Sequence, residues 1–180
     1  MTLRLSIFTI LLLALAATLS AVEDPIQEQM VSIISDIDNY VSWPAAKASD
    51  NGKPFFVAIL GKSELATRVK ELNRTKLPDG RKIRVRIVAG DLLPSNAHIV
   101  INSLTDEKQV RKYLKKLAGT STLTISTGDI DVETILHMDV VDKGGKQEVR
   151  TTLNAKQAAD EGLKIKSKLE KMAVGTDDNS

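Results

Sequence analysis

The sequence contains no cysteine, only two histidines and only six aromatic residues (one Trp, two Tyr and three Phe) among its 180 positions. Without a thiol, the chain forms no disulfide, no cysteine-ligated zinc site and no cysteine nucleophile. His98 and His137 are far apart in the sequence, which disfavours a zinc hydrolase. A domain of this size buries enough apolar surface to fold without disulfides. These absences narrow the enzyme classes that the chain could belong to.

Neither sign of charge dominates, since 25 Lys and Arg face 23 Asp and Glu, for a formal net charge of +2. The strongly positive field of a nucleic-acid-binding protein is therefore missing, and we expect no nucleic-acid partner. The chain also lacks a phosphate-binding loop, a paired-carboxylate motif and a nucleophile elbow. We expect a binding protein that is not an enzyme and has no cofactor. It would bind either a protein partner or a small ligand, and an exported hydrolase is the third hypothesis.

Only one hydrophobic run is long, and it lies at the start of the chain. Residues 1–4 form a short, positively charged start that ends in Arg4, residues 5–19 are apolar, and Ser20 and Ala21 are small. This order is typical of a secretory signal peptide, with cleavage after Ala21. An uncleaved N-terminal anchor is the alternative, although the run is short for a hydrocarbon core of about 30 Å. We expect an exported protein that begins at Val22 and does not insert stably into the membrane.

The middle of the chain predicts alternating strands and helices. Apolar residues at helical spacing indicate a helix over 25–40, and Trp43-Pro44 ends it. Residues 45–53 are expected to be a loop. Apolar or alternating runs predict strands at 54–60, 83–87, 98–101 and 123–126, and helical spacing predicts helices at 63–72 and 106–117.

Towards the C-terminus, residues 134–141 and 147–153 predict two strands joined at Gly144-Gly145. A two-residue turn there fixes the register. It pairs Leu136 with Leu153, Met138 with Thr151, Asp139 with Arg150, and Val140 with Val149. One register therefore gives both an apolar face and an opposite-charge pair.

After this hairpin, Asn154 is expected to cap a helix to about residue 161, and Gly162 to end it. A last helix would carry Ile165, Leu169 and Met172. The whole pattern predicts a single α/β domain over 22–174, a sandwich with a mixed β-sheet and helices on both faces, followed by a disordered tail at 175–180.

Small polar residues follow three of the predicted strands. In open α/β sheets, ligands bind beyond the carboxyl ends of the strands, so these residues are candidates for binding an amino acid or an organic anion. The alternative is that they only cap helices and form turns. The candidate ligand-binding residues are Gly61, Lys62, Ser63, Asn102, Ser103, Ser126 and Thr127.

Other polar groups favour structural roles. His137 shares a predicted strand face with Asp139, but no serine nucleophile motif accompanies this pair. His98 fits a position in the core or at its rim. The alternating acids Asp129, Asp131 and Glu133 lack the glycine turn and ligand spacing of a calcium loop, and no metal site is expected.

Two features are candidates for protein docking. The helix at 106–117 has a basic side formed by Lys108, Arg111, Lys112, Lys115 and Lys116. Such a side is usually only solvated, but it also suits an acidic partner or a membrane surface. Tyr40 and Trp43 are the aromatic candidates, and a core position is the alternative for the tryptophan. The partner-binding residues that we predict are Tyr40, Trp43, Arg111, Lys112 and Lys115.

Several short motifs then follow one another in a recognisable order. They are an aromatic–x–x–Trp–Pro element at 40–44, a Phe-led apolar strand ending in glycine at 56–61, a turn and basic strand at 77–88, strands near 98–102 and 123–126 around a Leu-x-x-Leu helix, and Asn154 before Gly-Leu-x-Ile-x-Ser-x-Leu at 162–169. Over 26–173, this order resembles the YfiR family of periplasmic regulators.

The resemblance implies a periplasmic repressor of an inner-membrane signalling receptor, such as a diguanylate cyclase that makes cyclic di-GMP. It also implies relief by an outer-membrane lipoprotein, and a homodimer. The chain departs from the family in two ways. It cannot form the disulfides that studied members carry, and residues 128–135 contain no aromatic residue where those members have a Gly-rich aromatic stretch.

Overall fold

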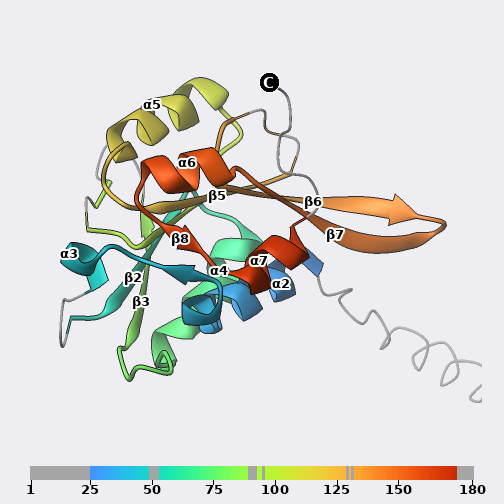
Figure 1. The fold of residues 1–180 in the computed structure, drawn as a ribbon. Helices are drawn as coiled ribbons and strands as arrows, with labels where there is room; N and C mark the ends of the chain where they lie inside the picture. Colours follow the sequence, from blue (N-terminus) through green and yellow to red (C-terminus); the bar gives the residue numbers. More distant parts are fainter. Residues whose placement is uncertain are drawn as a thin grey trace, which may run out of the picture.

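The computed structural model describes residues 25–48, 53–88, 93–94, 96–128, 130 and 132–173 (Figure 1). The predicted leader and tail lie outside these residues. The helices are α2 (Pro25–Ser35), α3 (Ala45–Ala48), α4 (Glu64–Lys70), α5 (Glu107–Leu117), α6 (Ala155–Asp160) and α7 (Ser167–Met172), with 3₁₀ turns η2 (Ile37–Asn39) and η3 (Glu71–Arg74). The strands are β1 (Val41–Ser42), β2 (Phe55–Leu60), β3 (Ile83–Val88), β4 (Ile99–Asn102), β5 (Leu123–Thr127), β6 (Leu136–Lys143), β7 (Lys146–Leu153) and β8 (Lys164–Ile165).

Six strands form one mixed sheet in the order β3-β2-β4-β5-β6-β7. All neighbours are parallel except β6 and β7, which form the antiparallel hairpin. The chain first adds β3 on one side of β2 and then crosses to add β4 on the other side. The carboxyl ends of β2 and β4 therefore flank a topological switch point, which is where open α/β sheets bind ligands.

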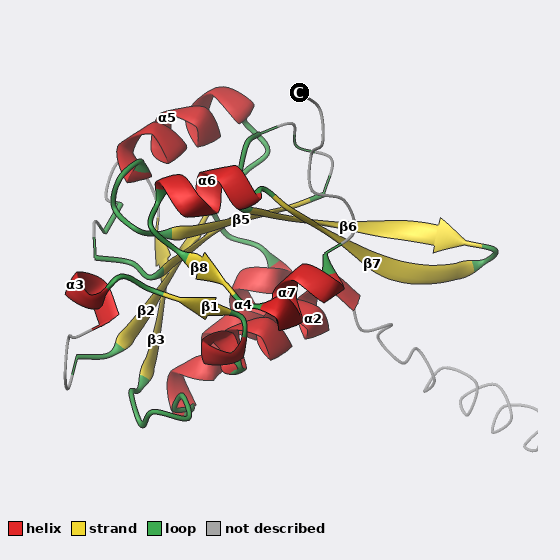
Figure 2. Ribbon diagram, in the orientation of Figure 1, coloured by secondary structure: helices red, strands yellow, loops and turns green. Residues whose placement is uncertain are grey.

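Helices cover both faces of this sheet, as predicted (Figure 2). Helices α2, α4 and α7 pack on one face around a large core that includes Met30, Val69 and Leu169. Helix α5 covers part of the other face, where Tyr113 and Leu117 close a smaller core. Every side chain of β2 is buried, because the strand lies between these two layers. Burying a large apolar side chain of this kind contributes about 1.5–3 kcal/mol to folding.

The hairpin has the predicted register. The ladder pairs Leu136 with Leu153, Met138 with Thr151, Asp139 with Arg150 and Val140 with Val149. Beyond its base the hairpin extends well outside the body of the domain (Figure 1). Val140 is consequently 39% exposed, whereas Leu136 and Met138, which lie on the same face nearer the base of the hairpin, are buried.

Three local expectations were wrong. The predicted loop after Pro44 begins with helix α3. The first helix ends at Ser35, and η2 replaces its last turn. Ile165 belongs to β8 rather than to the last helix, and it pairs with Val41 of β1 in a separate two-stranded sheet. Within the described ranges, no helix has both the length and the apolar character needed to span a bilayer.

Candidate functional site

A cleft of about 590 Å³ lies beside the switch point, at the carboxyl ends of β2, β4 and β5. Its lining includes three of the predicted ligand-binding residues, Ser63, Ser103 and Thr127. These residues follow three different strands, and the parallel arrangement brings them to one edge of the sheet. The other four predicted residues, Gly61, Lys62, Asn102 and Ser126, are not part of the lining.

Hydrogen bonds within the chain already use several of the predicted side chains, among them Ser63 and Asn102. Ser63 Oγ accepts a hydrogen bond from the Ala66 backbone N–H at 3.0 Å, which caps α4. Asn102 Oδ1 accepts from the Leu104 N–H, and its Nδ2 donates to the Leu104 carbonyl, both at 3.1 Å. Both side chains therefore stabilise a helix start or a turn, which was the alternative to ligand binding in the sequence analysis.

Ser103 differs from these two residues. Its Oγ is buried and has no hydrogen-bond partner among the described residues. A buried hydroxyl without a partner costs about 1–3 kcal/mol, so a ligand group that bonds to it recovers free energy. Ser103 is therefore the side chain in this cleft with the clearest capacity to recognise a ligand.

Gly61 shapes the cleft through its backbone. Its φ of +88° lies in the left-handed region, and a Cβ atom at this position would come within 2.8 Å of Leu104 Cδ2. The end of β2 consequently packs closely against the loop that follows β4, and Leu104 contributes to the cleft lining. The predicted residue Gly61 has a steric role at the switch point.

The charges around the cleft are acidic. Glu64 and Glu107 belong to the lining, and none of the described residues in the lining is basic. Lys62, the one basic residue among the predicted anion contacts, is exposed and outside the lining. This electrostatic environment favours a neutral or cationic group, such as the amino group of an amino acid, over an isolated anion. Anion binding at the strand ends stays a prediction.

A polar chain links Ser126 to the hairpin. Ser126 Oγ lies 2.7 Å from Thr134 Oγ1 and 2.8 Å from His137 Nδ1, and His137 Nε2 lies 2.7 Å from Asp139 Oδ1. Arg150 donates to Asp139 Oδ2 at 2.8 Å. The predicted His–Asp pair therefore exists, with a serine on its far side.

This arrangement connects strands rather than presenting a nucleophile. Ser126 is 0% exposed and is not part of the cleft lining, so its hydroxyl is out of reach of a substrate. Burial raises the pKa of Asp139, but the hydrogen bonds and charges of Arg150 and His137 outweigh it and hold that pKa below its ordinary value. The carboxylate thus stays ionised and ties β6 to β7.

The two aromatic docking candidates lie mostly in the core. Tyr40 is 6% exposed, and the Lys168 ammonium group lies 4.6 Å from the centre of its ring. The half-buried Trp43 contacts Phe55 edge-on at 5.3 Å, and Phe55 stacks on His98 at 4.5 Å. Little of either candidate ring is available to a partner, and their docking role stays a prediction. The core or rim position expected for His98 is confirmed, since it is 5% exposed.

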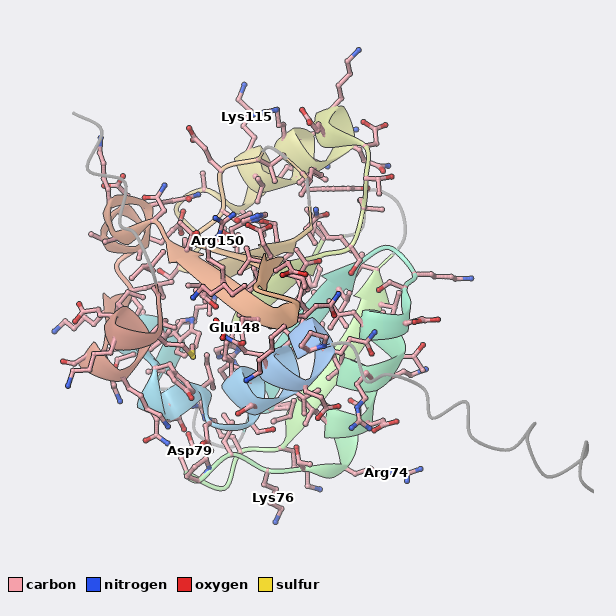
Figure 3. All side chains as sticks on the ribbon, turned by 90° about the vertical axis from the view of Figure 1, so that its right-hand side faces the viewer. Arg74, Lys76, Asp79, Lys115, Glu148 and Arg150 are labelled. Atoms are coloured by element: carbon pink, nitrogen blue, oxygen red, sulfur yellow. The ribbon has the colours of Figure 1, made fainter. Side chains whose placement is uncertain are left out.

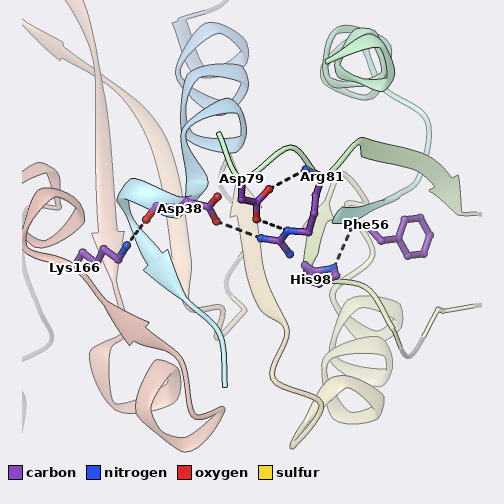
Figure 4. A network of polar contacts seen from close by, with 6 residues as sticks. All are labelled: Asp38, Phe56, Asp79, Arg81, His98 and Lys166. Atoms are coloured by element: carbon purple, nitrogen blue, oxygen red, sulfur yellow. Dashed lines mark hydrogen bonds and ion pairs between the residues drawn. The ribbon is translucent and has the colours of Figure 1, made fainter. Parts of the chain in front are cut away.

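The structure adds an ion-pair network that sequence reasoning missed (Figure 4). Arg81 contacts Asp79 and, at 3.5 Å, Asp38, while its guanidinium lies 5.3 Å from the Phe55 ring centre. Burial raises the pKa of Asp38, as does the nearby Asp79, and Arg81 and Lys166 offset part of this effect. Lys166 also donates to the Asp38 carbonyl, so the network fastens η2 to the turn before β3 and to the segment after β8.

A second missed cluster surrounds Lys47. Its Nζ donates to the Thr120 carbonyl at 2.7 Å and to Thr122 Oγ1 at 2.9 Å. Burial lowers the pKa of Lys47 to about 8, although the charge of Glu161 acts in the opposite direction. Glu161 accepts hydrogen bonds from two backbone N–H groups of the loop between α5 and β5. The cluster thereby holds α3, this loop and α6 together.

The predicted basic side of α5 is on the surface. Lys108, Arg111, Lys112, Lys115 and Lys116 are all exposed, while Val110, Tyr113 and Leu117 face the core. Lys115 extends away from the body of the domain (Figure 3). Glu107 lies 3.7 Å from Arg111 and offsets part of the charge at the start of the helix. This face is the predicted docking feature that the fold leaves most accessible.

Among the described residues, no group of three or more histidine and acidic side chains is placed to hold a metal ion. Two of the three alternating acids considered in the sequence, Asp129 and Asp131, lie outside the described residues. The site derived above therefore consists of the strand-end cleft and the basic face of α5.

The mixed sheet with helices on both faces defines a single α/β domain, with a cleft at its switch point and an exposed basic helix face. The family comparison is more specific, because the YfiR/HmsC-like family matches residues 28–174. The chain therefore belongs to the YfiR/HmsC-like family, whose members are periplasmic regulators rather than enzymes. A comparison with curated proteins found no significant match.

Proposed function

We propose that this protein is an exported regulator without catalytic activity, which binds an inner-membrane signalling receptor such as a diguanylate cyclase and holds it inactive. The observation that carries the proposal is the family match over residues 28–174. Export is supported by the basic, apolar and small-residue order of residues 1–21. An outer-membrane lipoprotein that sequesters the regulator would restore receptor activity and the synthesis of cyclic di-GMP.

Such a regulator needs no chemistry of its own. It has to bind the inactive state of the receptor more tightly than the active state. A preference of about 3 kcal/mol shifts the equilibrium between the two states more than a hundredfold. A few charge-assisted contacts at a well-packed interface are sufficient for a difference of this size.

The basic face of α5 is the docking surface that we assign to an acidic patch on the receptor's periplasmic domain. Its charged side chains are exposed, whereas Tyr40 and Trp43 are largely committed to the core. Opposite charges accelerate association and fix the orientation of the two partners. Exposed side chains of this kind can usually be changed with little effect on folding.

The test is co-purification of the receptor's periplasmic domain with the intact exported protein, together with measurement of cellular cyclic di-GMP. We expect the double variant Lys112→Glu and Lys115→Glu to weaken binding at least tenfold and to raise cyclic di-GMP. The control is Lys76→Glu with Lys171→Glu, which changes the net charge equally at exposed positions elsewhere. Equal weakening by both pairs would reject α5 as the docking surface. Unchanged cyclic di-GMP after deletion of the whole protein would reject the regulatory role.

A second candidate function is recognition of an amino acid or another small ligand at the strand-end cleft. The buried Ser103 hydroxyl without a partner and the volume of the cleft favour it. Thermal unfolding in the presence of individual amino acids is a direct test. A stabilising amino acid should lose its effect in Ser103→Ala, and no shift with any amino acid would count against this function.

A further inference from the structure

A second cavity, of about 460 Å³, lies on the sheet face partly covered by α5, near the amino-terminal half of β2. It is bounded by β2, by β3 and by the residues that precede β4. The polar and aromatic residues that matter in its lining are Lys53, Phe56, Arg84, Arg86, Asn96 and His98. The charged residues that the structure describes in its lining are all basic, so its electrostatic character is opposite to that of the strand-end cleft.

Arg84 and Arg86 occupy alternate positions of β3, so their side chains leave the same face of the sheet. Their Cα atoms are about 6.6 Å apart by the rise of a parallel strand. In the ladder they lie beside Phe56 and Ala58 of β2. Two arginines with this Cα spacing on one face can direct both guanidinium groups towards a single anionic group.

Arg86 is held in place by an aromatic ring. Its guanidinium lies 5.3 Å from the centre of the Phe56 ring, which is itself only 7% exposed. The ring is fixed because it packs in the smaller core, on the side of the strand opposite to Arg81 (Figure 4). A cation–π contact of this kind leaves the N–H donors of the guanidinium group available to an anion. This contact reduces the conformational entropy that Arg86 loses when it binds an anion.

Neither arginine has a carboxylate partner among the residues that the structure describes. Other arginines of the domain do have one, as Arg68, Arg81, Arg111 and Arg150 show. Charges on an outer strand also discourage edge-to-edge aggregation, which is the simplest other reason for these residues. Edge protection does not explain why the two charges line a cavity with an aromatic wall.

We propose that this cavity binds a small organic anion, with its phosphate or carboxylate group between Arg84 and Arg86 and its apolar part against Phe56. The volume is within the range of small-molecule sites. The bidentate donors of the arginines match both anionic groups. Anion recognition, which the sequence suggested at the carboxyl ends of the strands, is thus assigned to a different part of the sheet.

The test is a titration of the purified, exported protein with phenyl phosphate and with benzoate at constant ionic strength, followed by calorimetry and by backbone amide shifts of β2 and β3. We expect saturable binding of at least one of the two anions. Arg84→Gln and Arg86→Gln should each raise the dissociation constant at least about tenfold. Arg86→Lys should also weaken binding, because it keeps the charge but loses the planar fork.

The matched control is Arg111→Gln, which removes the same charge from an exposed position on α5. It should leave the dissociation constant within twofold of the wild-type value. The proposal fails if neither anion saturates, if Arg111→Gln weakens binding as much as Arg86→Gln, or if uncharged benzyl alcohol binds as tightly as benzoate. No receptor is present in this experiment, so its result is independent of the regulatory function proposed above.

Discussion

Replacing Gly61 by alanine tests whether the end of β2 packs against the loop after β4 as closely as the structure shows. Gly61 has φ +88°, and an added Cβ would lie 2.8 Å from Leu104 Cδ2 and 3.3 Å from the Ser103 carbonyl oxygen. Gly80 offers a matched control, because its φ is +87° and an added Cβ would meet nothing within 4 Å. The two substitutions therefore share the backbone strain and differ in the steric contact.

The expected costs follow from these two contributions. The left-handed conformation costs a residue with a side chain about 1–2 kcal/mol, and this applies at both positions. Overpacking adds about 1–3 kcal/mol, and it applies only at Gly61. The entropy that alanine removes from the unfolded chain acts equally in both variants, so it cancels in the comparison. We expect Gly61→Ala to destabilise the protein by about 1–3 kcal/mol more than Gly80→Ala.

Urea unfolding at pH 7 measures this difference, provided that the m-value is unchanged. Removing the contacted side chain with Leu104→Ala should recover most of the excess cost of Gly61→Ala in a double-mutant cycle, but none of the backbone contribution. Equal costs for Gly61→Ala and Gly80→Ala, or no coupling to Leu104, would refute the close packing at the switch point.

Three further outcomes test other parts of the structure. The folded-state pKa of Lys47 is about 8, below its ordinary value of 10.5, so the folded protein loses this proton at a lower pH than the unfolded chain does. The free energy of unfolding should therefore rise with pH above 8. After allowance for solvent screening, the rise between pH 7 and 9.5 should be about 1–2 kcal/mol larger in the wild type than in Lys47→Met, by urea unfolding at each pH. Asp139→Asn should lower the free energy of unfolding at pH 7 by about 1–3 kcal/mol, because it weakens the bond to Arg150. That loss should shrink at acidic pH, where the wild-type carboxylate is protonated as the pH falls through its lowered pKa, and an unchanged loss would contradict the assignment. Asn73→Ala should cost about 1 kcal/mol and increase aggregation in light-scattering measurements, because Asn73 Oδ1 accepts from the Val85 N–H on the outer strand β3.

The sequence was informative wherever one segment determines its own structure. The register of the hairpin followed from alternation on both strands and from a two-residue glycine turn, and the ladder has the same pairs. Strand β2 was recognisable because six successive apolar residues are typical of a strand covered on both faces. In these cases, the local pattern and the burial imposed by the fold agree.

Pairing between distant segments was not predictable in this way. Val41 and Ile165 belong to two-residue strands that are separated by most of the chain. Ile165 is also spaced from Leu169 as two residues on one face of a helix would be, so the local pattern favoured the wrong element. Only the tertiary contact of β1 with β8 distinguishes the two structures.

The candidate sites show the same limit. Parallel strands necessarily bring their carboxyl ends together, so a cleft lined by Ser63, Ser103 and Thr127 could be anticipated. Its acidic character could not, because Glu64 and Glu107 lie at helix starts where acids are common for reasons of stability alone. Arg84 and Arg86 are likewise indistinguishable in sequence from an ordinary solvated strand face.

The degree of burial separates the residues of this domain that can change a binding equilibrium from those that mainly stabilise the fold. Substituting Tyr40, which is 6% exposed, would lower stability, and any loss of binding would then follow from unfolding. Lys112 and Lys115 are exposed, so a loss of binding on charge reversal there reports on the interface itself. A variant that keeps its unfolding midpoint but no longer binds the receptor identifies a docking residue. A variant that loses both stability and receptor binding identifies only a residue of the core. The exposed face of α5 is therefore better suited than the buried aromatic pair to be the docking surface of the proposed regulator.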